Sequence, residues 1–237
     1  QTITLTANNA TAINGVAFTD VFPIGIEVAA TPGLTNTCGG TLTGATAGSG
    51  LLSLTGGTIP ASGSCLVRVT VTSPDTAEYV NSTGTVTTSN AGTFGPATAT
   101  LNVLAPPLII KTFSPASIAT GDGSNGAPYS TLTISLSNPT SATVSITGIS
   151  VIDTFPTNLV VHRTVQDTTS CDGSFDEQSG NGISRNDTGL RLTGVTLAPN
   201  ASCQVTVRVR SATAGIYTNT TNAVTTTNAG TGVTASA

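Results

Sequence analysis

The sequence contains no methionine and no tryptophan, and only 4% of its 237 residues are aromatic. Charged residues are also scarce, at 8%, compared with about 25% in an average soluble protein. Lys111 is the only lysine and His162 is the only histidine. Because the net charge is −4 and no basic cluster exists, the chain lacks the positive surface on which nucleic-acid binding depends.

Long apolar runs and catalytic motifs are also missing. The most apolar stretch, residues 103–110, is interrupted by two prolines, so we expect no membrane insertion. The glycines of "GDGSNG" (121–126) have dinucleotide-site spacing, but no helix pattern follows them, as such a site requires. His162 has no cysteine or serine at a recognisable spacing that could act as its nucleophile. We therefore expect neither an enzyme nor a cofactor.

Two loops contain oxygen ligands of the kind that calcium prefers. Their residues are Asp122, Ser124 and Asn125 in the first loop, and Asp172, Asp176 and Glu177 in the second. The first loop lacks the glutamate at its twelfth position that completes a calcium loop. The second has the composition of an ordinary solvated acidic loop, so we predict no metal site.

What the sequence does contain is a repeat. The segment "VTTSNAG" (86–92) recurs as "VTTTNAG" (224–230). Longer blocks recur in the same order: residues 2–11 match 131–140, 15–23 match 148–156, 64–71 match 202–209, and 79–93 match 217–231. The chain is therefore predicted to contain two copies of one domain, in residues 1–104 and 105–237.

Within each copy the pattern is that of β-strands. In "CLVRVTV" (65–71) and "CQVTVRVR" (203–210), apolar and polar residues alternate with period two, as in half-buried strands. This alternation places Arg208 and Arg210 on the outer face. Turns are expected at Asn-Gly pairs, namely Asn14-Gly15, Asn125-Gly126 and Asn181-Gly182. We predict an all-β protein with two tandem immunoglobulin-like β-sandwich domains.

The four cysteines fall as one pair per copy, Cys38 with Cys65 and Cys171 with Cys203. Neither pair has C-x-x-C spacing and no histidines accompany them, which argues against zinc. Two disulfides would indicate an oxidising, extracellular or cell-surface location. Buried free thiols are the alternative.

Residues 106–161 resemble the opening of a repeat family found in large bacterial surface proteins. The resemblance rests on an apolar strand, a Lys-x-Phe-Ser-Pro run, a threonine-rich strand ending in Asn-Pro, and a strand end of the form Asp-x-x-Pro. The residues that match are Lys111, Phe113, Ser114, Pro115, Asn138, Asp153 and Pro156. The resemblance implies an extracellular, modular and non-enzymatic protein, and it supplies no catalytic residues. From the sequence alone we expect Asp153 and its repeat partner Asp20 to cap turns at their strand ends.

The copies differ at their beginnings. Copy two has a leading segment, Leu101–Ser130, that copy one lacks, so copy one is predicted to miss its first strand. The corresponding assembly strand of copy two consists of Leu108, Ile109, Ile110, Lys111 and Phe113. An incomplete sheet edge is a template for a strand from elsewhere. We therefore expect copies of the chain, or adjacent repeats of a longer chain, as partners in a surface stalk or filament assembled head to tail.

Lys111 allows two interpretations. In the first, it is a solvated lysine that protects the edge of the sheet. In the second, it forms a covalent cross-link to Asn219, Asn222 or Asn228, with Asp153 as catalyst.

The sequence also contains five glycosylation triplets, which predict exposed positions if the host glycosylates. They begin at Asn9, Asn81, Asn186, Asn200 and Asn219. The alternative to a structural role is an adhesin that binds glycan or protein through its loops.

Overall fold

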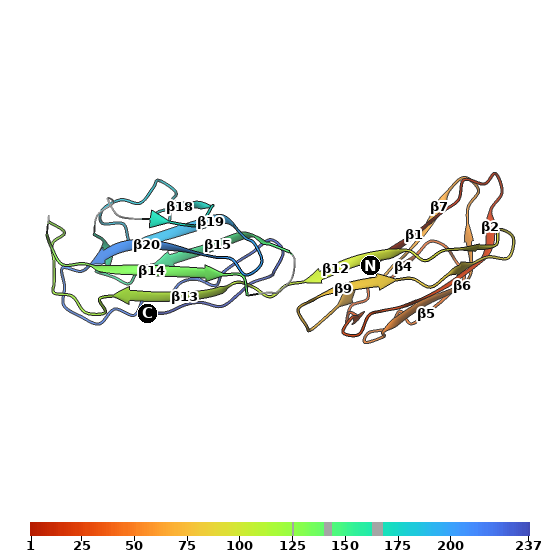
Figure 1. The fold of residues 1–237 in the computed structure, drawn as a ribbon, viewed down its shortest axis with the longest axis horizontal. Coiled ribbons are helices and arrows are strands. Elements are labelled where there is room, and N and C mark those ends of the chain that lie inside the picture. The colour runs from red at the N-terminus through yellow and green to blue at the C-terminus, as the bar shows by residue number, and fades with distance from the viewer. Residues whose placement is uncertain (125, 140–143, 163–167) are drawn as a thin grey trace. The chain divides into compact units, whose positions relative to one another are not determined.

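The computed structural model describes residues 1–124, 126–139, 144–162 and 168–237, all of which form strands, turns and loops without a helix. Accordingly, none of these residues belongs to a helix able to span a membrane. The chain divides into two compact units, Gln1–Val103 and Leu104–Ala237. Each is an immunoglobulin-like β-sandwich (Figure 1), which confirms the predicted fold class.

Unit 1 is built from short antiparallel strands in two layers. One layer has the order β1-β7-β4, from Thr2–Thr6, Ser64–Arg68 and Thr35–Asn36. The other has the order β11-β10-β2-β6-β5, from Thr93–Phe94, Val86–Thr87, Ile13–Val21, Leu51–Ile59 and Thr41–Thr43. Two further two-stranded sheets are formed by β9 (Ala77–Ser82) with β12 (Thr98–Val103) and by β3 (Glu27–Val28) with β8 (Val71–Thr72).

Unit 2 also has two layers, and its strand equivalent to β1, which is β14 (Ser130–Ser137), has a further neighbour, β13 (Leu108–Ser114). Its first layer has the order β13-β14-β20-β16, from Leu108–Ser114, Ser130–Ser137, Ser202–Arg210 and Val160–Val161, and β17 (Thr168–Thr169) also pairs with β20. The second layer has the order β15-β19-β18, from Ile146–Thr154, Gly189–Leu197 and Ser174–Asp176. Isolated bridges from Ser150 to Thr225 and from Asp153 to Thr221 extend it. Strand β13 therefore forms an edge of the first layer, next to β14 (Figure 1).

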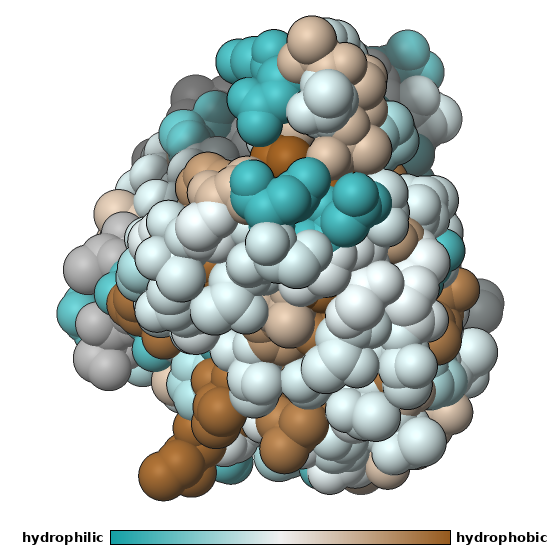
Figure 2. All heavy atoms as spheres, turned by 90° about the vertical axis from the view of Figure 1, so that its right-hand side faces the viewer, coloured by the Kyte–Doolittle hydropathy of each residue, from teal (hydrophilic) through white to brown (hydrophobic). Residues whose placement is uncertain are grey.

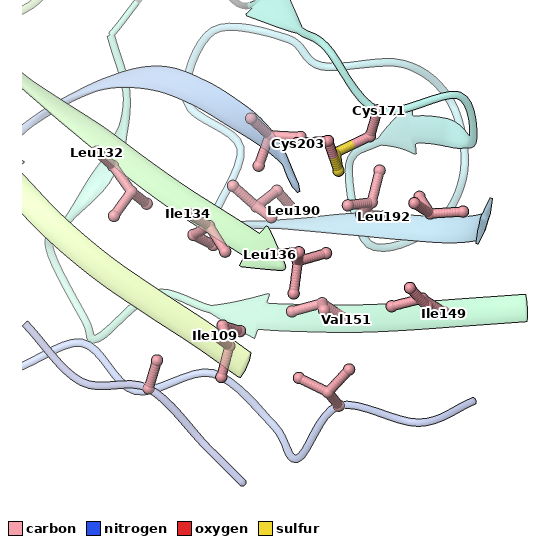
Figure 3. Packing of buried hydrophobic residues seen from close by; sticks show 14 of the residues in the cluster. Ile109, Leu132, Ile134, Leu136, Ile149, Val151, Cys171, Leu190, Leu192 and Cys203 are labelled. Carbon is pink, nitrogen blue, oxygen red and sulfur yellow. A yellow bond between two sulfur atoms is a disulfide. The ribbon is translucent and has the colours of Figure 1, made fainter. Parts of the chain in front are cut away.

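The core of unit 2 follows from period-two alternation on both layers. Leu132, Ile134 and Leu136 of β14 are each 1% exposed and face the second layer, where Leu190 and Leu192 lie (Figure 3). Each such side chain contributes about 1.5–3 kcal/mol when it is fully buried. Burial of this one face therefore fixes which side chains of each strand point inward.

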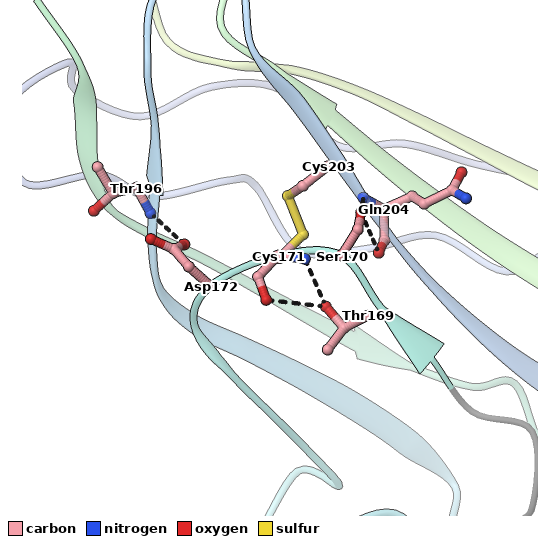
Figure 4. The surroundings of a disulfide bond; sticks show 7 residues. All are labelled: Thr169, Ser170, Cys171, Asp172, Thr196, Cys203 and Gln204. Atoms are coloured by element: carbon pink, nitrogen blue, oxygen red, sulfur yellow. Dashed lines mark hydrogen bonds between the residues drawn. A yellow bond between two sulfur atoms is a disulfide. The ribbon is translucent and has the colours of Figure 1, made fainter.

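Both predicted disulfides are present, Cys38–Cys65 and Cys171–Cys203, and no cysteine is free. Each links a central strand, β7 or β20, to the segment that carries the first cysteine. Figure 4 shows how this segment is held in unit 2, where the backbone nitrogen of Cys171 donates to Thr169 Oγ1 at 2.9 Å. The alternative of free thiols is excluded.

Each unit also contains a tyrosine that the sequence analysis did not single out. The Tyr217 hydroxyl donates to the carbonyl of Thr213 at 2.8 Å and accepts from Ser211 Oγ at 3.0 Å. Tyr79 contacts Ser73 and the Asp75 carbonyl in the same manner. A tyrosine that bonds to backbone a few residues upstream is the "tyrosine corner" of immunoglobulin-like sandwiches.

One predicted turn is wrong. Asn14-Gly15 lies inside β2, where the register against β6 shifts and Gly15 has a φ of +62°. Gly148 occupies the equivalent place in β15, at a φ of +63°. An extra residue in one strand forms a β-bulge, and glycine accepts the left-handed backbone that this requires. The pair that includes Asn125 falls outside the described residues.

The alignment of the two copies predicted from the sequence is also wrong at strands β1 and β14. Residues 2–11 match residues 131–140 by letter, which would align Leu5 with Ile134. In the structure, however, Leu5 pairs with Cys65, whereas the residue that pairs with the equivalent Cys203 is Leu136. The two strands are therefore equivalent with a shift of two residues. A shift of two keeps the same side chains inward, so the alternation pattern could not reveal it.

Arg210 does not face solvent as predicted. It is only 8% exposed, and its guanidinium donates to the Gly121 carbonyl at 3.1 Å and to Asn186 Oδ1 at 2.6 Å. A loop that folds over the end of β20 covers this position. Figure 2 shows one face of the molecule, which is mostly pale, the colour of intermediate hydropathy, with separate brown and teal patches.

Candidate functional site

The most unusual feature of unit 2 is a lysine inside the sandwich. Lys111 extends inward from β13, and its Nζ lies 2.7 Å from Asp153 Oδ1 of β15 in the opposite layer. Both side chains are completely inaccessible to solvent. The inward position follows from alternation, because Ile109 on the same face is also buried while Leu108 and Ile110 are exposed.

A third buried side chain completes the site. Asn219 is 0% exposed, and its Nδ2 donates to Asp153 Oδ2 at 3.0 Å. Its backbone is fixed by two hydrogen bonds with Ala237, of 2.8 and 3.0 Å. The two oxygens of one carboxylate therefore contact Lys111 on one side and Asn219 on the other. Within the part of the chain that the structure describes, Asn219 Oδ1 is buried and has no hydrogen-bond partner.

Burial disfavours the charged forms of both ionisable groups. Loss of solvation raises the pKa of Asp153, although hydrogen bonds from Lys111 and Asn219 oppose this. Loss of solvation likewise lowers the pKa of Lys111, and its contact with Asp153 opposes it. Both shifts move the pair towards a neutral amine beside a neutral carboxylic acid.

Unit 1 contains the same site without the lysine. Asp20 is 0% exposed, and Asn81 Nδ2 donates to both of its oxygens, at 2.9 and 3.0 Å. The remaining contact is made by the side-chain amide of Gln1. Asn81 Oδ1 is also buried and has no partner among the described residues.

Among the described residues, no strand equivalent to β13 pairs with β1 and no lysine contacts Asp20. In unit 2, Lys111 of β13 pairs with Ile134 of β14. In unit 1 the equivalent strand β1 pairs only with β7 among the described residues, so its other edge is open. Because Leu5 and Leu136 pair with the equivalent cysteines, Ile3 is equivalent to Ile134, so a strand pairing with this edge in the manner of β13 would place its lysine opposite Ile3.

These contacts decide several sequence predictions. Asp20 and Asp153 do not cap turns, because their carboxylates point into the core. Lys111 is not a solvated edge residue. Of the three candidate asparagines, Asn219 alone contacts Asp153 among the described hydrogen bonds, whereas Asn228 donates to the Ser145 carbonyl.

The glycosylation triplets differ in exposure. Asn9, Asn186 and Asn200 are exposed as expected. Asn219 is fully buried and Asn81 is half-buried, and both donate to an aspartate. The folded protein therefore does not present the Asn219 amide for modification by sugar, which corrects that expectation.

The other polar candidates lie apart from this site. Among the described residues, no group of three or more histidine, cysteine and acidic side chains could hold a metal. Asp122 accepts from the Ser124 backbone at 2.8 Å, and Asp172 accepts from the Thr196 backbone at 2.9 Å. His162 is 2% exposed and its ring lies 5.3 Å from that of Tyr129.

A cavity of about 930 Å³ adjoins the lysine within unit 2. Lys111, Phe113, Leu159, Val209 and Tyr217 line it, together with Ala237 at the end of the chain. The buried site therefore lies next to a space that opens along the edge of the sandwich.

Both units match a single family, described as a domain of unknown function (DUF7933), over residues 1–103 and 107–237. The chain belongs to this family. Among curated protein sequences, none matches the chain.

Solved structures give distant similarities. The full-length major pilin SpaD of Corynebacterium diphtheriae is 13% identical with a TM-score of 0.38, covering 100% of this chain and 64% of the pilin. The collagen-binding domain of the surface protein RspB of Erysipelothrix rhusiopathiae is 12% identical with a TM-score of 0.29, covering 99% and 79%. The exo-chitosanase CsxA of Amycolatopsis orientalis is 14% identical with a TM-score of 0.28, and this chain, covered to 100%, spans 25% of its length.

Proposed function

We propose that this chain is a structural building block of an extracellular stalk or filament, in which a strand from a neighbouring repeat or copy completes unit 1. The observation that carries the proposal is the open edge of β1 beside a buried Asp20 that no described cation contacts. Asn81 and Gln1 donate hydrogen bonds to Asp20, but a buried carboxylate without a cation beside it remains costly. In unit 2 the same place is filled by a strand that supplies a lysine.

The composition supports an extracellular role. Two disulfides are typical of oxidising compartments. The chain has one lysine, which is buried, and six arginines, so it offers few sites for trypsin-like proteases to cleave.

The incoming strand would have the pattern of β13. Its inward positions would place an apolar residue and a lysine two residues apart, as Ile109 and Lys111 are in unit 2. Hydrogen bonds along the backbone would supply affinity, and the lysine at Asp20 would fix the register. This is strand complementation, and a contact of this kind that does not close on itself generates a linear assembly.

A labelled peptide with the sequence of residues 107–115 tests the proposal, with binding followed by fluorescence anisotropy. We expect saturable binding to the wild-type chain, weaker binding to the Asp20→Asn variant, and weaker binding of a peptide with methionine in place of lysine. The peptide could also displace β13 from unit 2, but that site is intact in the Asp20→Asn variant. Any difference in binding between the two chains therefore reports on unit 1. Absence of saturable binding, or equal binding to both chains, would contradict the proposal.

Electron microscopy of the purified chain tests assembly directly. Uniform fibres would support polymerisation by the chain itself, whereas dispersed particles would restrict the role to a segment of a stalk. The alternative role as an adhesin stays a prediction, which a glycan array would test.

A further inference from the structure

Three side chains in unit 2 have the arrangement required for a covalent reaction. Lys111 supplies an amine, Asn219 supplies a carboxamide, and the carboxyl of Asp153 contacts both, at 2.7 and 3.0 Å. All three side chains are buried, so water does not compete at the site. We propose that an intramolecular isopeptide bond joins Lys111 Nζ to Asn219 Cγ, with Asp153 as the catalytic residue. The proposal concerns unit 2 alone and does not depend on the proposed assembly.

The reaction is an amide exchange that balances without a co-reactant. A proton passes from Lys111 Nζ to Asp153, which leaves a neutral amine and a carboxylic acid. The amine attacks Asn219 Cγ, and Asp153 relays one further proton from Nζ to the departing nitrogen. The bond from Cγ to Nδ2 breaks, the bond from Cγ to Lys111 Nζ forms, and neutral ammonia leaves while Asp153 stays protonated.

The surroundings favour the required protonation states. An ammonium group is not a nucleophile, and a carboxylate cannot donate a proton. Burial lowers the pKa of Lys111 and raises that of Asp153, so both shifts favour the reactive forms. In water, by contrast, the charged pair would dominate at neutral pH.

Asn219 Oδ1 adds an independent observation. This buried oxygen has no hydrogen-bond partner among the described residues, and a buried polar atom without a partner is costly. Rotation of the amide by half a turn brings this oxygen against Asp153, where the protonated acid can donate to it. That hydrogen bond would polarise the carbonyl and stabilise the negative charge that develops as the amine attacks.

The fold holds the reactants in place and provides an exit. Lys111 lies on the first strand of the unit, while Asn219 lies on a segment whose backbone bonds to Ala237. Such fixed proximity replaces a bimolecular encounter by an intramolecular one. The adjoining cavity, which Lys111 and Ala237 both line, gives ammonia a route from the core.

The single lysine allows a direct test. Mass spectrometry of the reduced wild-type chain should show the loss of one ammonia. Amine-reactive labelling of the denatured chain should leave Lys111 unmodified, and tandem spectra of a tryptic digest should identify a branched peptide joining Lys111 to Asn219. An unreacted Lys111 and a linear Asn219 peptide would overturn the proposal.

Matched variants distinguish the isopeptide bond from other reactions that release ammonia. Cyclisation of Gln1 or of an Asn-Gly pair also releases ammonia, but it would persist in Lys111→Met, whereas the isopeptide loss would vanish. Asn222→Ala, at an exposed neighbour of the site, should retain the branched peptide. Asp153→Asn should retain both reactants without the bond, and formation of the bond in that variant would overturn the catalytic role of Asp153. Because the wild-type result is decisive alone, a variant that fails to fold does not weaken the test.

Discussion

The double variant Lys111→Met/Asp153→Asn distinguishes a covalent site from an ion pair by its effect on stability. Both replacements are close in size to the original side chains and carry no charge. The amide introduced at position 153 could still form a hydrogen bond with Asn219, so few buried polar groups would be left without partners. The variant removes the salt bridge of 2.7 Å together with any bond that Lys111 forms.

An ion pair and a covalent bond at this site lead to different expected losses in the free energy of unfolding of the double variant. If the site is an ion pair, replacing both buried charges by neutral groups of similar volume should leave the free energy of unfolding nearly unchanged. If Lys111 and Asn219 are bonded, the cross-link closes a loop of roughly 100 residues, which contributes about 4.7 kcal/mol at 25 °C in the chain-entropy model. A loss of this size should lower the melting temperature of a unit of this length by about 15–25 °C.

Differential scanning calorimetry under non-reducing conditions measures this difference. We expect the transition of unit 2 to move to lower temperature while that of unit 1 is unchanged. Asn222→Ala serves as the matched control and should leave both transitions in place. A double variant within about 1 kcal/mol of the wild type would refute the covalent interpretation.

Three further predictions concern the fold of unit 2. Replacing Cys171 and Cys203 by serine should lower the free energy of unfolding by about 3.7 kcal/mol in the chain-entropy model for a separation of 32 residues, measured by urea unfolding. Gly148→Ala should destabilise by at least about 1 kcal/mol more than Gly194→Ala. Both glycines have positive φ, but a Cβ at Gly148 would overlap the side-chain oxygen of Thr227, whereas a Cβ at Gly194 would meet no atom within 4 Å. Equal effects of the two replacements in thermal melts would contradict this. Tyr217→Phe removes the hydroxyl bonds of the tyrosine corner and should cost about 1–1.5 kcal/mol, with an unchanged circular dichroism spectrum.

Much of the architecture could be predicted from the sequence because it follows from local patterns. Period-two alternation identified the central strands β7 and β20, and the repeat predicted that one fold occurs twice. Both disulfides could be predicted because each copy contains one pair of cysteines, and the second cysteine of each pair lies at an inward position of its strand. The leading segment of copy two also indicated that β1 lacks a neighbouring strand.

Other features could not be predicted because they depend on contacts distant in sequence. Alternation placed Arg210 outside, but a loop folds over it and supplies acceptors. The bulge at Gly15 resembled a turn because both conformations require the same left-handed backbone.

The candidate site shows this division most clearly. By itself the sequence determined that Lys111 is the single lysine, that it lies on a first strand, and that Asp153 and several asparagines follow. The tertiary structure alone decided that Lys111 points inward and meets Asp153 and Asn219, and that Asp20 and Asn81 form the same pair without a lysine. The physical reason is that two layers packed face to face bring together side chains from different strands, and the pattern along any single strand does not contain that information.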